Sequence, residues 1–206
     1  MKKRSDIRKS SDILSVTDRK LCREEFLSRI ERIAAARPAG IILREKDLSE
    51  EQYQSLAEQV LEICRKQETQ CILHSFYDTA LELGCDRIHL PLSVLKDMEP
   101  GKRKQFRILG ASCHSAEDAF LAEKMGCSYI TAGHIFETDC KKGLPGRGLE
   151  FLEEVCRKVS VPVYAIGGIT AADMGRIRQA GAAGACVMSG LMTCEDPKEY
   201  LEGFKE

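Results

Sequence analysis

The sequence predicts an α/β fold, a (β/α)8 TIM barrel in a single domain, and three observations lead to this prediction. Short apolar runs recur eight times along the 206 residues. Amphipathic segments with helix-capping residues lie between these runs. No linker or low-complexity stretch divides the chain. We therefore expect residues 1–11 to form a basic N-terminal extension and residues 12–206 to form the barrel.

The predicted strands are rich in β-branched and aliphatic residues and mostly lack strict alternation of apolar and polar positions. Parallel strands that are buried on both faces have this pattern. The predicted strands span residues 13–17, 40–44, 71–75, 87–91, 107–112, 128–133, 161–167 and 185–189.

Helical patterns alternate with these strands, and several carry clear start signals. Ser49 is followed three residues later by Gln52, which is the spacing of a capping box. Pro197 directly follows Asp196, as at a capped helix start. The predicted helices span residues 24–36, 49–66, 76–83, 115–125, 149–158, 170–180 and 196–204, while residues 92–105 fit either a short helix or a loop.

Repeated strand–helix units can close into a barrel or form a doubly wound open sheet. The absence of a second domain favours the barrel. No Gly-x-Gly-x-x-Gly motif follows the first predicted strand, which lowers the expectation of a dinucleotide-binding fold.

Composition narrows the choice of partner and compartment. The net charge is −1, so we expect no nucleic-acid partner. No apolar run is long enough for a membrane span or a signal peptide, so we expect no membrane partner and a cytoplasmic location. The ten cysteines form no Cys-x-x-Cys pair, which argues against zinc-ribbon and thioredoxin-like sites and favours reduced thiols.

Two loops near the C-terminus have the features of a phosphate site. Barrel enzymes carry their active sites at the carboxyl ends of the strands. Gly167 and Gly168 follow the seventh predicted strand, and Ser189 and Gly190 end the eighth. Small residues before a helix allow backbone N–H groups to approach an anion. The alternative is that these residues only turn the chain from strand to helix.

The loop 137–148 is long for a strand-to-helix connection and contains Lys141, Lys142 and Arg147. A loop of this length is commonly a lid over an active site. Its basic residues could cover a phosphate, or they could be a solvated charge run.

His134 is the candidate for acid–base chemistry, because it ends the sixth predicted strand and an imidazole can exchange protons near neutral pH. The alternative is a structural role. His74 could line the site, His89 lies within the fourth predicted strand and could face either side, and His114 is expected to begin a helix.

The run from Gly133 to Gly148, GHIFETDCKKGLPGRG, resembles the TenI family of thiazole tautomerases, a sister of thiamine phosphate synthase. Both families are (β/α)8 barrels. The resemblance extends through four shorter motifs and covers residues 12 to the C-terminus. These motifs are LREK at 43–46, GASCHS at 110–115, AIGGI at 165–169 and VMSG at 187–190.

The resemblance implies a choice between the two sisters. The synthases hold Mg²⁺ with aspartates after strands 3 and 4, but this chain has His74-Ser75 and residues 91–94, PLSV, at those places. The synthases have proline after the strand-6 glycine, whereas this chain has His134, the catalytic residue of the tautomerases. Arg44, Lys46, Ser112 and Lys141 match positions that contact diphosphate in the synthases.

The resemblance therefore implies an isomerase of thiamine biosynthesis that aromatises a thiazole phosphate carboxylate by proton transfer at His134. We expect a small-molecule thiazole phosphate as partner and no cofactor, with Mg²⁺ needed only by a synthase. One alternative is a transferase that joins hydroxymethylpyrimidine diphosphate to thiazole phosphate. Another is a non-catalytic thiamine-phosphate-binding regulator. A homo-oligomer is compatible with the sequence.

Overall fold

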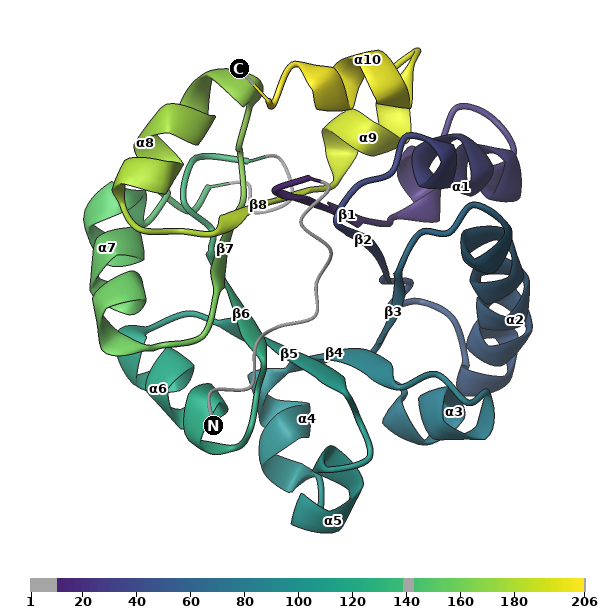
Figure 1. Cartoon of the computed structure of the whole chain (residues 1–206), viewed down its shortest axis with the longest axis horizontal. Helices are drawn as coiled ribbons and strands as arrows, with labels where there is room; N and C mark the ends of the chain where they lie inside the picture. The colour runs from purple at the N-terminus through teal and green to yellow at the C-terminus, as the bar shows by residue number, and fades with distance from the viewer. Residues whose placement is uncertain (1–10, 139–142, 206) are drawn as a thin grey trace. The chain divides into compact units, whose positions relative to one another are not determined.

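The computed structural model describes residues 11–138 and 143–205 and confirms the predicted fold (Figure 1). Eight strands form a closed barrel in the order in which they occur along the chain. Their bounds are β1 Ile13–Val16, β2 Gly40–Leu43, β3 Cys71–His74, β4 Arg87–Pro91, β5 Ile108–Cys113, β6 Tyr129–Gly133, β7 Val163–Ile166 and β8 Gly184–Val187.

The strand pairs are parallel, as the apolar runs predict. Ile41 of β2 pairs with Cys71 of β3, and Ala132 of β6 pairs with Ala165 of β7. All residues of β1, β2, β3, β6 and β8 are buried, so these strands have no solvent-facing side that would impose alternation.

The barrel divides into two compact units, and the divisions fall within β4 and β8. We call residues His89–Cys186 the central unit, and residues 11–88 together with 187–205 the terminal unit.

The central unit contains α4 Leu92–Asp97, α5 Pro100–Arg103, α6 Ala116–Lys124, α7 Gly148–Lys158, the 3-10 helix η3 Ala171–Asp173 and α8 Met174–Gln179. Figure 1 shows α6 and α7 side by side on the outer face of the sheet formed by β5, β6 and β7. The segment for which the sequence left helix and loop open is thus two short helices, and Met98 and Glu99 between them are extended.

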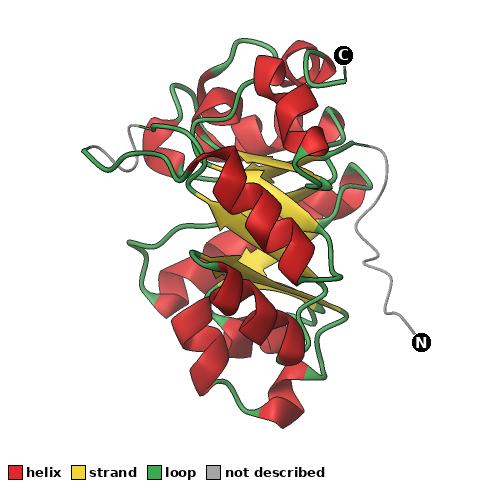
Figure 2. Ribbon diagram, turned by 90° about the vertical axis from the view of Figure 1, so that its left-hand side faces the viewer, coloured by secondary structure: helices red, strands yellow, loops and turns green. Residues whose placement is uncertain are grey.

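The terminal unit contains the 3-10 helix η1 Arg19–Leu21, α1 Phe26–Ala35, α2 Glu50–Lys66, α3 Tyr77–Glu82, α9 Ser189–Thr193 and α10 Pro197–Glu202. Figure 2 distinguishes helices in red from strands in yellow. The predicted capping box at α2 is present, because Ser49 accepts from the Gln52 backbone and the Gln52 side chain accepts from the Ser49 backbone.

Several cysteines fill the core as small apolar residues. Cys71, Cys113 and Cys186 are at most 2% exposed, and burial raises the pKa of the Cys113 thiol to about 12. The nine described cysteines are free thiols. Within residues 11–138 and 143–205, no helix is long and apolar enough to cross a membrane.

The predicted basic extension lies almost wholly outside the described residues, which begin at Ser11. The first strand begins at Ile13, one residue after the predicted start of the barrel domain. The boundary at residue 11 therefore stays a prediction.

Candidate functional site

His134 follows β6 directly, as predicted, and its side chain is half-buried. Its Nε2 lies 3.3 Å from the Leu144 carbonyl oxygen, and its own carbonyl accepts from the Arg147 N–H at 3.0 Å. Because a carbonyl only accepts, the proton of this contact belongs to Nε2. In the neutral ring the Nδ1 lone pair is then the group that can accept a proton or a hydrogen bond.

The glycine pair after β7 packs against the segment that begins at His134. The Ile135 N–H donates to Ile166 and the Phe136 N–H donates to Gly167, which extends the β6–β7 pairing past the strand ends. Both Gly167 and Gly168 have positive φ, +102° and +66°. A Cβ at Gly167 would collide with the His134 side chain, and a Cβ at Gly168 would collide with the Glu137 carbonyl.

This packing explains why glycine is needed at both positions, and the sequence alone did not reveal it. The two residues allow close contact with the segment after β6, whether or not an anion binds there. Gly168 is exposed, and the chain continues through Ile169 and Thr170 before η3 begins. The predicted helix start at Thr170 is confirmed, because Thr170 is the N-cap of η3.

His114 supports the end of β6, a role that the sequence did not predict. Its Nδ1–H donates to the Gly133 carbonyl at 2.9 Å. It precedes the N-cap Ser115 of α6 and so does not begin that helix. The expectation that His114 only begins a helix missed this contact, because the partner is nineteen residues away along the chain.

Ser112, near the end of β5, is half-buried and hydrogen-bonded to His89 of β4. His89 is 3% exposed, and its Nε2 lies 2.9 Å from Ser112 Oγ while its Nδ1 lies 2.8 Å from the Tyr129 hydroxyl. Burial lowers the pKa of His89 to about 3, so the ring is neutral at physiological pH. His89 therefore points to Ser112, which resolves the two orientations left open by the sequence.

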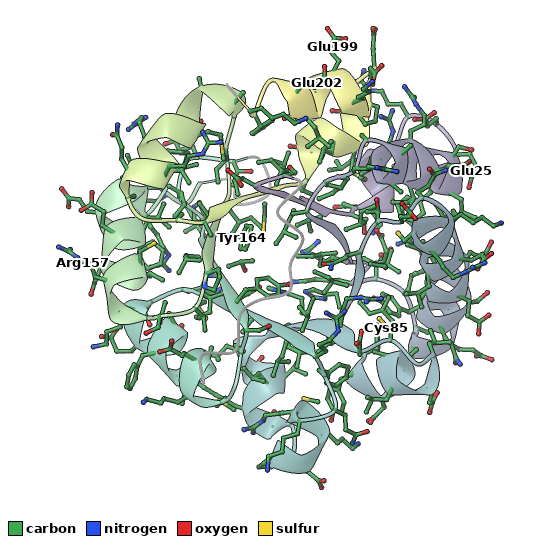
Figure 3. The ribbon with its side chains drawn as sticks, viewed as in Figure 1. Glu25, Cys85, Arg157, Tyr164, Glu199 and Glu202 are labelled. Carbon is green, nitrogen blue, oxygen red and sulfur yellow. The ribbon has the colours of Figure 1, made fainter. Side chains whose placement is uncertain are left out.

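The aromatic neighbours of this network also lie in the central unit. The rings of Tyr129 and Tyr164 meet edge to face with centroids 5.9 Å apart. Figure 3 shows Tyr164 projecting from β7 on the side opposite α7, whereas Arg157 of α7 points away from the strands. Tyr164 is buried.

In the terminal unit, Arg44 and Lys46 follow β2 on either side of Glu45. Arg44 is half-buried and Lys46 is exposed. The Arg44 N–H donates to Thr17 Oγ1 at 2.9 Å, which fixes its backbone. Among the described residues, no hydrogen bond or ion pair involves the Arg44 guanidinium. A half-buried cation in this state is a candidate anion-binding group.

Glu45 is 3% exposed and joins the loop after β1 to the loop after β2. Its Oε1 accepts from the Thr17 hydroxyl at 2.7 Å and from the Arg19 N–H at 3.1 Å, and its Oε2 contacts Arg19 Nη1 at 3.1 Å. Arg19 also forms two hydrogen bonds with Asp47, at 2.6 and 2.8 Å. This cluster holds the chain on both sides of Arg44.

The prediction that Ser189 and Gly190 precede a helix is wrong, because they are the first two residues of α9. A Cβ at Gly190 would collide with the Tyr200 ring of α10. Close packing of α9 and α10 therefore requires glycine at this position. This short helix carried no capping signal, which is why the sequence pattern missed it.

The residues at the two aspartate positions of the synthases do not fit a protein-bound Mg²⁺ ion. His74 is buried, and its Nδ1 lies 2.7 Å from Ser75 Oγ. Residues Leu92–Asp97 form α4, and its first turn has no acidic residue. Within the described ranges, no group of three His, Cys, Asp or Glu side chains could hold a metal. Mg²⁺ requires oxygen ligands such as carboxylates, which these positions lack.

A hollow of about 530 Å³ lies beside the loop after β6 in the central unit. Arg147 and Arg176 border it, and each guanidinium lies over an aromatic ring, Phe151 and Phe136 respectively. Lys141 and Lys142, predicted to cover a phosphate, lie outside the described residues.

Comparisons with known proteins agree in the family that they indicate. A family model described as thiamine monophosphate synthase matches residues 13–191. The chain is 33% identical to thiamine-phosphate synthase 2 of Streptococcus pneumoniae, covering 88% of this chain and 87% of that protein. It is also 33% identical to the thiamine-phosphate synthase of Desulfitobacterium hafniense, covering 93% and 94%. The structure of thiamine phosphate pyrophosphorylase from Pyrococcus furiosus matches with a TM-score of 0.80 and 26% identity, covering 94% and 93%.

These findings overturn the expectation of an isomerase. The similar proteins are named synthases, which are transferases, and not tautomerases. The wider resemblance on which the expectation rested is confirmed, together with its place in thiamine biosynthesis. The chain belongs to the thiamine monophosphate synthase family.

Proposed function

We propose that this chain is a thiamine-phosphate synthase, a transferase that joins hydroxymethylpyrimidine diphosphate to thiazole phosphate. The names of its relatives and the match over residues 13–191 support this activity. In this reaction a ring nitrogen of the thiazole forms a bond to the pyrimidine methylene carbon. The bond from that carbon to the diphosphate oxygen breaks, and diphosphate leaves with the electron pair.

Arg44 carries this proposal furthest among the described residues. Arg44 is half-buried, and its guanidinium has no carboxylate partner among the described residues, while its backbone N–H is bonded to Thr17. A leaving diphosphate gains negative charge as its bond breaks, and a positioned guanidinium stabilises that charge. We assign Arg44, Lys46, Ser112 and Lys141 to the diphosphate, in line with the positions that they match.

The remaining predicted residues have roles in binding the thiazole substrate. We assign a phosphate-binding role to the backbone of Gly167 and Gly168 in the central unit and, separately, to that of Ser189 and Gly190 in the terminal unit. His134 stays the proposed catalytic residue, now of the transferase, with its Nδ1 available to contact the substrate. Its Nε2–H contact with Leu144 supports this orientation.

This chain has no carboxylate ligands for Mg²⁺ at the two family positions, so we assign no role in the reaction to the metal. The proposal assigns charge neutralisation to the protein's own cations. Magnesium dependence is therefore a question that the activity assay answers directly, by comparing turnover with excess Mg²⁺ and with a chelator.

The experiment mixes the purified protein with both substrates and measures thiamine phosphate by chromatography. Wild-type protein is expected to form it, and Arg44→Met is expected to be roughly ten- to a hundredfold slower because a hydrogen bond to a charged group is lost. Arg157→Met is the matched control, since Arg157 is exposed on α7 and points away from the strands. Absence of product from the wild type, with or without Mg²⁺, would contradict the proposed function.

A further inference from the structure

Four polar side chains of the central unit form one buried network across β4, β5 and β6. His89 Nδ1 lies 2.8 Å from the Tyr129 hydroxyl, and His89 Nε2 lies 2.9 Å from Ser112 Oγ. The Thr131 hydroxyl donates to Ser112 Oγ at 3.4 Å. His89, Tyr129 and Thr131 are at most 3% exposed, whereas Ser112 is half-buried. Ser112 is thus the member of the network that a ligand can reach.

The Tyr129 hydroxyl is held in place by the shape of the neighbouring strand. A Cβ at Gly110 of β5 would collide with the Tyr129 ring, so only glycine there allows the ring to cross β5 and reach His89. Burial raises the pKa of Tyr129 well above its ordinary value, so the phenol keeps its proton. In the described part of the chain, His89 is the hydrogen-bond partner of this hydroxyl.

The proton of Tyr129 sets the tautomer of His89. A buried hydroxyl proton without an acceptor carries the full desolvation cost, so the Tyr129 O–H donates to Nδ1. A neutral imidazole has one N–H and one lone pair. With its lone pair at Nδ1 occupied by Tyr129, His89 carries its proton on Nε2, and this N–H donates to Ser112 Oγ.

Ser112 then has one hydrogen-bonding capacity left, which is its own proton. A hydroxyl offers one donor and two acceptor sites. Both acceptor sites of Ser112 are used, one by the His89 N–H and one by the Thr131 hydroxyl, whose oxygen also lies 3.5 Å from His89 Nε2. The remaining O–H can only donate, so it favours a ligand oxygen that carries negative charge.

We propose that His89 is a positioning residue that fixes the Ser112 hydroxyl as a hydrogen-bond donor to an anionic oxygen of the substrate. This inference rests on the proposed function in assigning that oxygen to a diphosphate. The network itself is a property of the ligand-free protein. Tyr129 acts at one remove, since it determines which nitrogen of His89 carries the proton.

The first test measures the tautomer directly. A long-range proton–nitrogen correlation spectrum of the ligand-free protein, with the His89 signals assigned from His89→Gln, reports which ring nitrogen is protonated. We expect a neutral ring with its proton on Nε2, unchanged between about pH 5 and pH 8. A proton on Nδ1, or titration within this range, would overturn the proposal. The spectrum distinguishes the two roles of His89, because a purely structural role in packing does not require one particular tautomer.

The second test measures coupling, with inorganic pyrophosphate as the probe in isothermal titration calorimetry. Ser112→Ala and His89→Gln are each expected to weaken binding roughly tenfold or more, and the double variant is expected to be no weaker than Ser112→Ala alone. Tyr129→Phe gives a second route to the same result. Additive losses in the Ser112→Ala background would show that His89 acts elsewhere and overturn the proposal.

The two tests separate this inference from the proposed function. If the wild type does not bind pyrophosphate, the assignment of Ser112 to a diphosphate fails, while the ring-nitrogen spectrum still decides whether His89 directs the Ser112 proton. If pyrophosphate binds but the tautomer is the other one, the proposed function stands and the positioning role fails.

Discussion

Each unit contains a cluster of buried polar side chains, and one cluster is neutral whereas the other is built on an ion pair. In the central unit, His89, Tyr129, Ser112 and Thr131 form a neutral network in which one proton sets the direction of the next. In the terminal unit, the buried carboxylate of Glu45 is paired with Arg19, which reaches out to the exposed Asp47. The first arrangement selects a donor direction, and the second fixes two loops by charge.

The difference in charge between the two clusters is related to the residue that each one positions, Ser112 in the central unit and Arg44 in the terminal unit. A neutral network keeps Ser112 half-exposed without adding a second charge beside a charged ligand. The Glu45 carboxylate is paired with Arg19, and Arg44 has no carboxylate partner in the described chain. Both arrangements therefore preserve groups that attract an anion. The following substitutions and conditions act on one cluster while leaving the other unchanged.

Among the substitutions, removal of the Glu45 carboxylate is expected to have the largest effect. Glu45→Ala leaves the buried Thr17 hydroxyl and the Arg19 N–H without their acceptor. We expect a loss of about 2–4 kcal/mol in the free energy of unfolding, measured by urea denaturation. A loss below that of Asp47→Ala would contradict the assignment of this carboxylate as the centre of the cluster.

Acid is expected to act next, and on the central unit. The pKa of His89 is lowered by burial from 6.5 to about 3 in the folded protein. The unfolded chain therefore binds the proton first, so stability from neutral His89 is complete above pH 6.5 and falls as the pH drops towards 3. The expected slope is up to about 1.4 kcal/mol per pH unit. Denaturation of His89→Gln over the same range should lack this component, and an equal slope in both proteins would refute it.

Tyr129→Phe is expected to cost less, about 1 kcal/mol, because it removes one hydrogen bond and keeps the ring over Gly110. Thermal unfolding measures this change. Tyr164→Phe is the matched control, since Tyr164 contributes a ring contact to Tyr129. An unchanged unfolding midpoint for Tyr129→Phe would show that its hydroxyl donates no stabilising hydrogen bond to His89.

Asp47→Asn is expected to have the smallest effect. Its carboxylate is exposed, and although Arg19 and Lys20 hold its pKa well below the ordinary value, solvent screens the interaction. We expect no measurable change in the unfolding midpoint in physiological salt. A shift as large as that of Glu45→Ala would place the centre of the cluster at the surface.

The sequence predicted the barrel because buried parallel strands leave a local signal. The run at 40–44 predicts β2 Gly40–Leu43, and that at 128–133 predicts β6 Tyr129–Gly133. Five-residue α9 left no such signal, since it lacks a cap and is held by packing of Gly190 against Tyr200.

The site was predicted in part, for a related reason. Residue type and position after a strand identified Arg44, Ser112 and His134. The contacts of His89 with Tyr129 and of Glu45 with Thr17 and Arg19 join residues that are far apart in the chain. A single sequence carries no signal for such pairs. The expectation of an isomerase was wrong. It rested on His134 and on the two missing aspartates, whereas the match to the synthase family extends over residues 13–191.

The most direct test of the transferase assignment follows both substrates by phosphorus NMR in the presence of the purified protein. We expect hydroxymethylpyrimidine diphosphate to be consumed only when thiazole phosphate is present, and diphosphate and thiamine phosphate to appear in equal amounts. Unchanged spectra with and without Mg²⁺, or release of diphosphate without thiamine phosphate, would contradict it.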